Sequence, residues 1–227
     1  MNLSKEQEMF YIQQVKINPL SLKDIDTQTD VICLEAVKRY GSALEYVKNQ
    51  TEEICLEAVT CWPNSLKFVK DQTKEICLEA VRQNGHVLRF VKKQTNEICL
   101  EAVRQNGRAL EWVENQTLEV CLEAIKQDDS ALKYVKEQTD EICLEAVKND
   151  GFALMFVKEQ TDEMCLEAVR QDSLVLEFVN FPTKEMKIIA KNTKSNVSYR
   201  QIRSRLVNKE ISLITSPYHV LEQLYNC

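Results

Sequence analysis

The sequence predicts an all-α fold, an α-solenoid of stacked 22-residue helix–turn–helix repeats with a helical C-terminal cap. The first observation is a nine-residue motif, Gln-Thr-x-Glu-(Ile/Val/Met)-Cys-Leu-Glu-Ala, which recurs six times at a fixed interval of 22 residues. The second is that all four glycines occupy one position of this repeat. A short fixed period is typical of units that stack in a row, because each is too small to bury its own apolar faces.

The first half of each repeat predicts a short α-helix. In the unit that begins at Gln50, Thr51 suits the N-cap, and Glu52 and Glu53 follow in the first turn, where the helix dipole favours acids. Apolar residues then cover most of the helix, and Glu57 is its one charged interruption. A helix that is apolar nearly all round must be covered on several sides, as it would be between neighbouring repeats.

The glycine position predicts the end of this first helix, because a left-handed glycine often closes a helix and a proline cannot continue one. This position is filled by Pro19, Gly41, Pro63, Gly85, Gly107, Asp129, Gly151 and Ser173. A second short helix is expected next, with a small residue, a leucine, an aromatic residue and a valine facing inward. The aromatic row consists of Tyr46, Phe68, Phe90, Trp112, Tyr134, Phe156 and Phe178. We expect this row in the core; the alternative is a platform on which bases stack.

The repeat pattern divides the chain into three parts. Residues 1–27 form a degenerate N-terminal capping repeat with a first helix from Gln7 to Asn18. Residues 28–181 hold seven 22-residue helical hairpin repeats, and residues 182–227 form a basic helical C-terminal cap. Terminal units with altered, more polar outer faces are what a solenoid needs to stay soluble.

Three helices are expected in the C-terminal cap. Thr183 to Lys191 resembles an eighth first helix, and Ser198 to Val207 and Ser216 to Asn226 follow it. Ser216 and Pro217 suit the N-cap and first position of the last helix. Eight basic and two acidic residues between Lys184 and Glu210 leave a net charge of −11 on residues 1–183.

Cysteine usage favours a reduced, intracellular protein without a metal centre. Seven of the nine cysteines fill one repeat position: Cys33, Cys55, Cys77, Cys99, Cys121, Cys143 and Cys165. Helices that stack at roughly 8–10 Å hold successive copies too far apart for a disulfide. No Cys-x-x-Cys pair is present, so we interpret the row as small buried side chains and expect no metal and no cofactor. The apolar runs are short and the start is not a secretory signal, so we expect no membrane association.

Charged and amide side chains also recur at the repeat interval. A glutamate row needs partners inside an apolar helix, and a basic residue three positions later predicts a pair within the same helix. The glutamates are Glu35, Glu57, Glu79, Glu101, Glu123, Glu145 and Glu167; the basic residues are Lys38, Arg82, Arg104, Lys126, Lys148 and Arg170, with Thr60 as the exception. The glutamine that begins each motif can bond loop backbone groups in its own or the next repeat.

The repeat unit resembles the helical repeats catalogued as domain of unknown function four-one-one-six. The unit has the pattern QTxEICLEAVxxxGxALxxVK and runs through residues 28–181. These repeats are abundant in giant viruses that infect amoebae and occur in some bacteria. The resemblance implies an all-helical repeat, a viral or host-interacting setting, and no catalytic residues. With it, we expect the protein in the cytoplasm of an infected host cell or in the virion.

The residues in which the repeats disagree predict a surface for a partner. Polar positions become aromatic or apolar at Tyr40, Trp62, Leu118, Phe152, Met155 and Leu174, and of these Tyr40, Trp62, Phe152 and Met155 are the candidate partner contacts. Tyr40 and Trp62 fill the same position of adjacent repeats, so they should be neighbours at the helix–turn edge. Exposed paired aromatics are favoured interface anchors. The alternative is that these residues pack locally or drifted neutrally.

The sequence therefore predicts a non-enzymatic protein-binding scaffold. The only histidines, His86 and His219, belong to no visible catalytic set, and there is no Gly-rich phosphate loop. The alternative is an RNA-binding solenoid that uses basic rows and the basic cap with Arg200, Arg203 and Arg205. One such row is Lys48, Lys70, Lys92, Lys136 and Lys158. The acidic stack opposes phosphate, and neither the partner nor the oligomeric state follows from the sequence.

Overall fold

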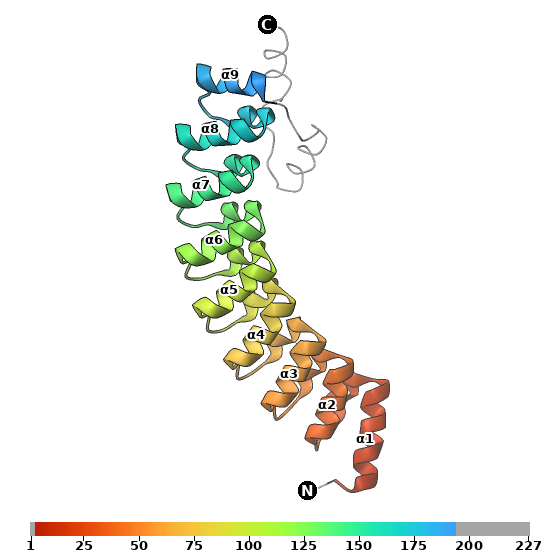
Figure 1. Ribbon diagram of the computed structural model, residues 1–227. Coiled ribbons are helices and arrows are strands. Elements are labelled where there is room, and N and C mark those ends of the chain that lie inside the picture. The colour runs from red at the N-terminus through yellow and green to blue at the C-terminus, as the bar shows by residue number, and fades with distance from the viewer. Residues whose placement is uncertain (1–2, 194–227) are drawn as a thin grey trace. The chain divides into compact units, whose positions relative to one another are not determined.

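The computed structural model describes residues 3–193, which fall into two compact units that divide between Asp128 and Asp129. Each unit is a stack of helical hairpins, and no strand occurs in the part of the chain that the structure describes (Figure 1). In the first unit the α-helices are α1 (Lys5–Ile17), α2 (Asp30–Arg39), α3 (Glu52–Cys61), α4 (Lys74–Gln83), α5 (Asn96–Gln105) and α6 (Leu118–Gln127). The fold is the predicted α-solenoid.

The second helix of each hairpin is a six-residue 3₁₀ helix. In the first unit these are η1 (Pro19–Asp24), η2 (Gly41–Tyr46), η3 (Pro63–Phe68), η4 (Gly85–Phe90) and η5 (Gly107–Trp112). Successive α-helices contact one another, and so do successive 3₁₀ helices. The two kinds of helix therefore form two parallel layers within the unit.

The second unit repeats this plan. It contains η6 (Asp129–Tyr134), α7 (Asp140–Asn149), η7 (Gly151–Phe156), α8 (Asp162–Gln171), η8 (Ser173–Phe178) and α9 (Lys184–Asn192). The predicted first helix of the C-terminal cap is thus present as α9. The two further helices predicted in that cap lie outside the described residues.

The α-helices of the motif repeats begin where the sequence predicts, whereas α1 begins at Lys5, before the predicted Gln7, with Ser4 as its N-cap. The threonine of the motif is the N-cap, and the Oγ1 of Thr51 accepts a hydrogen bond from the backbone N–H of Ile54 at 3.3 Å. The same bond recurs in the other motifs, for example between Thr73 and Ile76. At the other end the backbone becomes extended, as at Tyr40, with φ −151° and ψ 96°, and the next 3₁₀ helix starts immediately.

The turn glycines serve close packing and do not adopt the left-handed conformation that the sequence suggested. A Cβ added at Gly85 would collide with the carbonyl oxygen of Ala102 in the next repeat, and one at Gly41 would collide with that of Ala58. The prediction of a left-handed helix end is therefore wrong. Glycine is needed because the next α-helix presses its backbone against the turn.

The core consists of small and branched side chains. In α3, Ile54, Cys55, Ala58 and Val59 are buried, and Leu66 of η3 is fully buried. The aromatic row is only half-buried in every repeat, so its predicted place in the core is wrong. Each aromatic residue is the last residue of its 3₁₀ helix. Cations cover some of the rings; the Nζ of Lys67, for example, is 4.6 Å from the Phe68 ring centroid.

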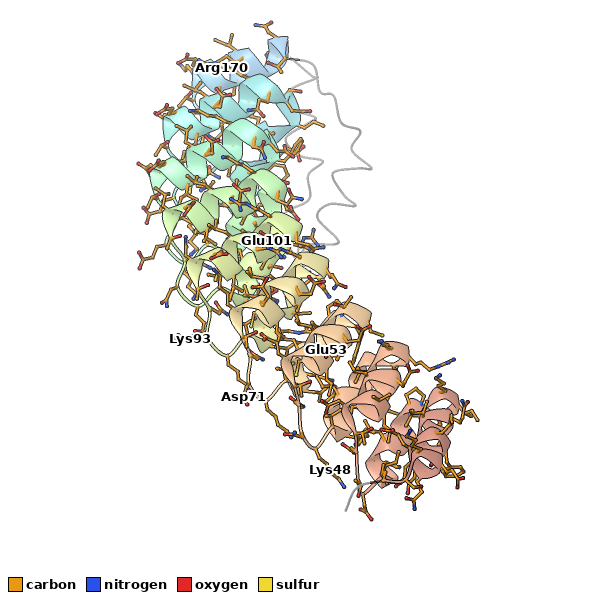
Figure 2. All side chains as sticks on the ribbon, turned by 60° about the horizontal axis from the view of Figure 1, so that its bottom comes forward. Lys48, Glu53, Asp71, Lys93, Glu101 and Arg170 are labelled. Atoms are coloured by element: carbon orange, nitrogen blue, oxygen red, sulfur yellow. The ribbon has the colours of Figure 1, made fainter. Side chains whose placement is uncertain are left out.

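Two arginines of the charged rows pair with a glutamate of the next repeat and not with the glutamate of their own helix. Arg82 Nε lies 3.3 Å from Glu101 Oε1, and Arg104 Nε lies 3.3 Å from Glu123 Oε1, in each case across to the next α-helix. The predicted pairs three residues apart are thus replaced by pairs between repeats. On the side of the loops that follow the 3₁₀ helices, Lys48, Asp71 and Lys93 line one edge of the first unit (Figure 2).

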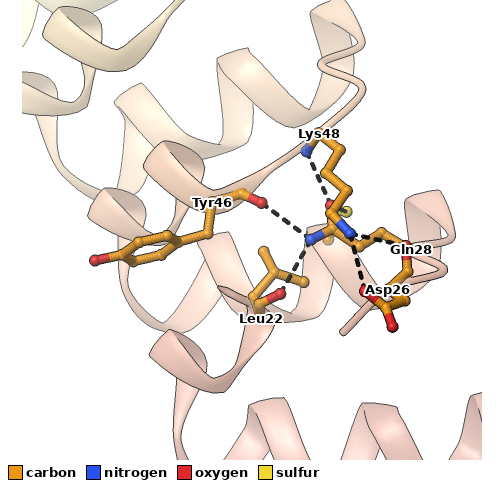
Figure 3. Close-up of polar contacts among 6 residues, drawn as sticks. Leu22, Asp26, Gln28, Tyr46 and Lys48 are labelled. Carbon is orange, nitrogen blue, oxygen red and sulfur yellow. Dashed lines mark hydrogen bonds and ion pairs between the residues drawn. The ribbon is translucent and has the colours of Figure 1, made fainter. Parts of the chain in front are cut away.

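The motif glutamine joins three backbone segments (Figure 3). The Nε2 of Gln28 donates to the carbonyl oxygens of Leu22 and Tyr46, each at 3.0 Å, and its Oε1 accepts from the N–H of Lys48 at 2.9 Å. Leu22 belongs to the first hairpin, whereas Tyr46 and Lys48 belong to the hairpin that Gln28 begins, so one amide links two repeats. Gln50, Gln72, Gln138 and Gln160 repeat this pattern. The predicted bonding of loop backbone groups is confirmed, and we call this contact the glutamine brace.

The lysine row is engaged with backbone carbonyls of the preceding repeat. Lys70 Nζ donates to the carbonyl oxygens of Val47 and Lys48 at 3.3 and 2.9 Å, and Lys92 Nζ donates to those of Val69 and Lys70 at 3.0 and 2.7 Å. These ammonium groups therefore hold the loops of neighbouring repeats together. No α-helix of the described chain is long and apolar enough to cross a membrane.

Candidate aromatic interface

The C-terminal end of α5 shows how a typical repeat uses three successive positions. Arg104 pairs with Glu123 of the next helix, and the Oε1 of Gln105 accepts a hydrogen bond from the N–H of Gly85 in the preceding repeat at 2.6 Å. Asn106 Oδ1 accepts from the N–H of Arg108 at 3.0 Å and so begins η5 with a side-chain cap. All three side chains thus make a polar contact that supports the stack.

The C-terminal end of α3 has different residues at all three positions. Thr60 replaces the arginine that would face Glu79, and Glu79 accepts a hydrogen bond from Gln83 at 2.9 Å instead. Cys61 has no amide with which to accept from the Gly41 N–H. Trp62 gives η3 no side-chain cap. The polar contacts made by the α5 end are therefore absent here.

One repeat earlier, Tyr40 occupies the same position as Trp62 and likewise replaces a polar capping residue. In five described repeats an asparagine or aspartate at this position caps the 3₁₀ helix: Asn18, Asn84, Asn106, Asp150 and Asp172. Tyr40 leaves η2 without such a cap, as Trp62 does for η3. Loss of a side-chain cap costs about 1 kcal/mol, so the two substitutions reduce stability unless another contact compensates.

The two aromatic rings lie against each other. Their centroids are 6.4 Å apart and their planes differ by 10°, which is a stacked arrangement. Tyr40 is 48% exposed and Trp62 is half-buried, and the Nζ of Lys67 lies 5.6 Å from the Trp62 ring centroid. The sequence prediction that these two residues are neighbours at the helix–turn edge agrees with this geometry. We call them the Tyr40–Trp62 pair.

The turn beneath Trp62 is unusual as well. Pro63 has no N–H, so the glutamine of the next repeat, Gln83, has no turn donor to accept from at this place. The buried Asn64 Oδ1 and Ser65 Oγ have no hydrogen-bond partner among the described residues. Buried polar atoms are normally bonded, and each exception destabilises the fold by about 1–3 kcal/mol. The departures from the repeat therefore concentrate in residues 60–65.

The other predicted partner-binding residues have different surroundings. Phe152 is buried, with its ring centroid 6.1 Å from that of Phe178 in an edge-to-face contact. Its prediction as an exposed anchor is wrong, because the ring packs locally against the next repeat. Met155 is half-buried in η7. Arg200, Arg203 and Arg205, the alternative nucleic-acid contacts, lie outside the described residues.

Two exposed apolar residues at the helix–turn edge of the first hairpin were missed in the sequence analysis. Ile17, at the end of α1, is 86% exposed, and Leu20, in η1, is 38% exposed. The terminal repeat was expected to be polar on its outside, yet Met9 and Phe10 of α1 are also exposed. The signal was available, because Ile17 and Leu20 occupy positions that hold Arg39 and Ser42 in the next repeat.

Metal-binding clusters and cysteine thiols are the two kinds of group that could carry chemistry in this protein. Among residues 3–193 no group of His, Cys, Asp or Glu is arranged to hold a metal ion. Burial raises the pKa of the seven thiols in the cysteine row, to about 11 for Cys33, Cys55 and Cys143. A thiol with a raised pKa is a poor nucleophile near neutral pH. Cys61 is the exposed exception among the described cysteines and lies beside Trp62.

Comparison with known proteins identifies the repeat. No curated protein and no solved structure matches the chain. A family model described as Domain of unknown function (DUF4116) matches residues 51–94, 73–118, 95–140, 117–161 and 139–184. The matches overlap, and each covers about two of the hairpins described above. Together they span more than half of the sequence, and the chain therefore belongs to this family of helical repeats.

Proposed function

We propose that the chain is a non-enzymatic protein-binding scaffold whose partner contacts the Tyr40–Trp62 pair. One observation carries this proposal. A stacked, partly exposed aromatic pair stands where the other repeats have hydrogen-bonding asparagine or aspartate. Aromatic side chains bring a large contact area at low entropic cost, and they are enriched in the centres of protein interfaces.

The distribution of the departures supports a selected surface. Neutral drift would scatter substitutions over the repeats, whereas here Thr60, Cys61 and Trp62 change together and Tyr40 changes beside them. Each change removes a polar contact that the typical repeat keeps. A protein retains such a local loss of stability where the residues serve another role.

RNA binding remains the alternative class. Against it, the Lys70 and Lys92 ammonium groups bond backbone carbonyls, and Arg82 and Arg104 pair with glutamates. Those cations are less available to phosphate. RNA binding would weaken steeply with salt, whereas contact through the aromatic pair would be much less sensitive.

The setting of this function comes from the family resemblance. Repeats of this kind in viruses of amoebae suggest a viral protein that engages a host or viral partner inside the infected cell.

The test replaces Tyr40 and Trp62 with asparagine, which other repeats carry at this position. The double variant Tyr40→Asn, Trp62→Asn is compared with wild type and with Leu118→Asn, which removes another exposed apolar side chain of the first unit. Tagged proteins are cross-linked in cells that support the virus, and the captured proteins are quantified by mass spectrometry. We expect a protein that wild type and Leu118→Asn capture equally and that the double variant loses. Equal capture by all three folded proteins would remove the proposal.

A further inference from the structure

The Tyr40–Trp62 pair belongs to a longer apolar strip on the first unit. Ile17 ends α1 and Leu20 lies in η1, and both are exposed. α1 contacts α2 and α2 contacts α3, while η1 contacts η2 and η2 contacts η3. Because the repeats stack in register, Ile17 and Leu20 lie at the same end of their hairpin as Tyr40 and Trp62. We call Ile17, Leu20, Tyr40 and Trp62 the apolar edge.

The apolar edge has a defined end. In the next two repeats the corresponding positions carry polar residues: Gln83, Asn84 and His86, and then Gln105, Asn106 and Arg108. These residues bond their own turns or the neighbouring repeat, as Asn84 does to the His86 N–H at 3.1 Å. The strip is therefore confined to three successive repeats. Apolar strips of this kind on a protein surface mark interaction sites.

The charged residues within the three segments that carry the apolar edge are all basic, although Glu35 and Glu45 lie in the adjoining parts of α2 and η2. Residues 16–20, 38–42 and 60–64 contain Lys16, Lys38 and Arg39 and no acidic residue. Lys16 pairs with Glu35 at 3.5 Å, whereas Lys38 and Arg39 are exposed, and Lys67 lies over the Trp62 ring. The first unit as a whole is acidic, with 16 basic and 20 acidic residues in positions 1–128. The apolar edge is thus a locally basic place on an acidic body.

The length of the apolar edge fits a short extended segment. Packed helices are roughly 8–10 Å apart, so three repeats span about 16–20 Å from the first to the third. An extended chain advances about 3.3 Å per residue, so about six residues cover this distance. Such a segment can place an apolar side chain on each repeat and acidic side chains between them.

Resting on the proposed function, we infer that the apolar edge binds an extended acidic segment of a partner protein that carries several apolar side chains. Its carboxylates face Lys38, Arg39 and Lys67, and its apolar side chains pack on Ile17, Leu20 and the Tyr40–Trp62 pair. A nucleic acid fits less well, because Ile17 and Leu20 offer no face on which bases stack. Its evenly spaced phosphates would also approach the acidic body of the unit.

The experiment selects binders from a displayed library of random peptides of about twelve residues, roughly twice the length that the edge requires. The full chain is the bait, and the most enriched peptide is synthesised with a fluorescent label and titrated against variants. We expect enriched peptides with an excess of Asp and Glu over Lys and Arg, together with Leu, Ile or aromatic residues. We expect Arg39→Glu to weaken binding about tenfold, since a repelling charge then replaces an attracting one.

Two controls make the outcome specific. Lys93→Glu reverses a charge on the loop edge of the same unit and should change affinity by less than about twofold, as a charge remote from the contact does. An oligouridine of similar length is titrated in parallel. Enrichment of uncharged or basic peptides, no enrichment at all, or an unchanged affinity in Arg39→Glu would overturn the acidic preference.

The result also separates this inference from the proposed function. If uncharged or basic peptides bind and Tyr40→Asn, Trp62→Asn abolishes that binding, the scaffold stands and only the acidic preference falls. If the oligouridine alone binds and depends on Tyr40 and Trp62, both proposals are overturned in favour of RNA.

Discussion

The C-terminal ends of α3 and α5 occupy the same positions of the repeat but contribute to the molecule in different ways. The α5 end, residues 104–106, makes an ion pair, a bond to a turn N–H and a cap, all of which support the stack. The α3 end, residues 60–62, makes none of these and presents a tryptophan against Tyr40. The α3 end has thus lost contacts that support the stack, and it carries instead the two residues of the proposed interface.

The largest effect is expected when the α3 end is transplanted onto α5. The triple variant Arg104→Thr, Gln105→Cys, Asn106→Trp removes an exposed ion pair, a cap and the acceptor of the Gly85 N–H. We expect the free energy of unfolding to fall by roughly 2–4 kcal/mol. Urea unfolding followed by circular dichroism measures it. An unchanged midpoint would show that these contacts do not support the stack.

The glutamine brace is common to both regions, so its removal shows what the shared framework contributes. Gln72→Ala leaves the carbonyls of Leu66 and Phe90 and the N–H of Lys92 without the amide. We expect a loss of about 2–3 kcal/mol, because the bonds to the two carbonyl oxygens are partly buried. Gln83→Ala is the control in the following helix. Its bond to Glu79 is exposed, so it should cost less than about 0.5 kcal/mol.

A smaller effect is expected when one contact is returned to the α3 end. Thr60→Arg places a cation opposite Glu79, as Arg82 lies opposite Glu101. Because both groups are partly exposed, the gain should be about 0.2–1 kcal/mol and should shrink at high salt. The same substitution in a Glu79→Gln background should give no gain. A gain that survives there would mean that the arginine acts through something other than this pair.

The cysteine row should leave the free energy of unfolding independent of pH near neutrality and should lower it at alkaline pH. Burial raises the pKa of Cys55 from 9.0 to about 11. Well below pH 9 the thiol is protonated in both the folded and the unfolded state. Between pH 9 and about pH 11 the unfolded chain releases a proton that the folded chain retains, so the free energy of unfolding falls. Urea midpoints measured across this range should fall in wild type and in Cys61→Ser, and less steeply in Cys55→Ala.

The fold could be predicted from the sequence because the same local signals recur in every repeat. The threonine N-caps and the links made by the motif glutamine follow from side-chain chemistry that is the same in every copy. Contacts between repeats were harder to predict. Arg82 pairs with Glu101 and not with Glu79, because the stacking distance brings the next helix within reach, and a sequence does not contain that distance.

The candidate site was partly predictable. Tyr40 and Trp62 were found because the repeat defines what each position should hold, and their adjacency followed from the period. Phe152 departs from the pattern in the same way but is buried against Phe178, since exposure depends on the packing of the following repeat. Ile17 and Leu20 were missed although they align with Arg39 and Ser42 of the next repeat, because the terminal repeat was expected to carry a polar outer face.

We propose that the Tyr40–Trp62 pair is retained at the expense of stability. The most direct test is the urea unfolding midpoint of the double variant Tyr40→Asn, Trp62→Asn. Asparagine restores the side-chain caps of η2 and η3, so we expect the free energy of unfolding to rise by about 1–2 kcal/mol. A lower midpoint than wild type would mean that the stacked rings hold the repeats together, and it would contradict the account.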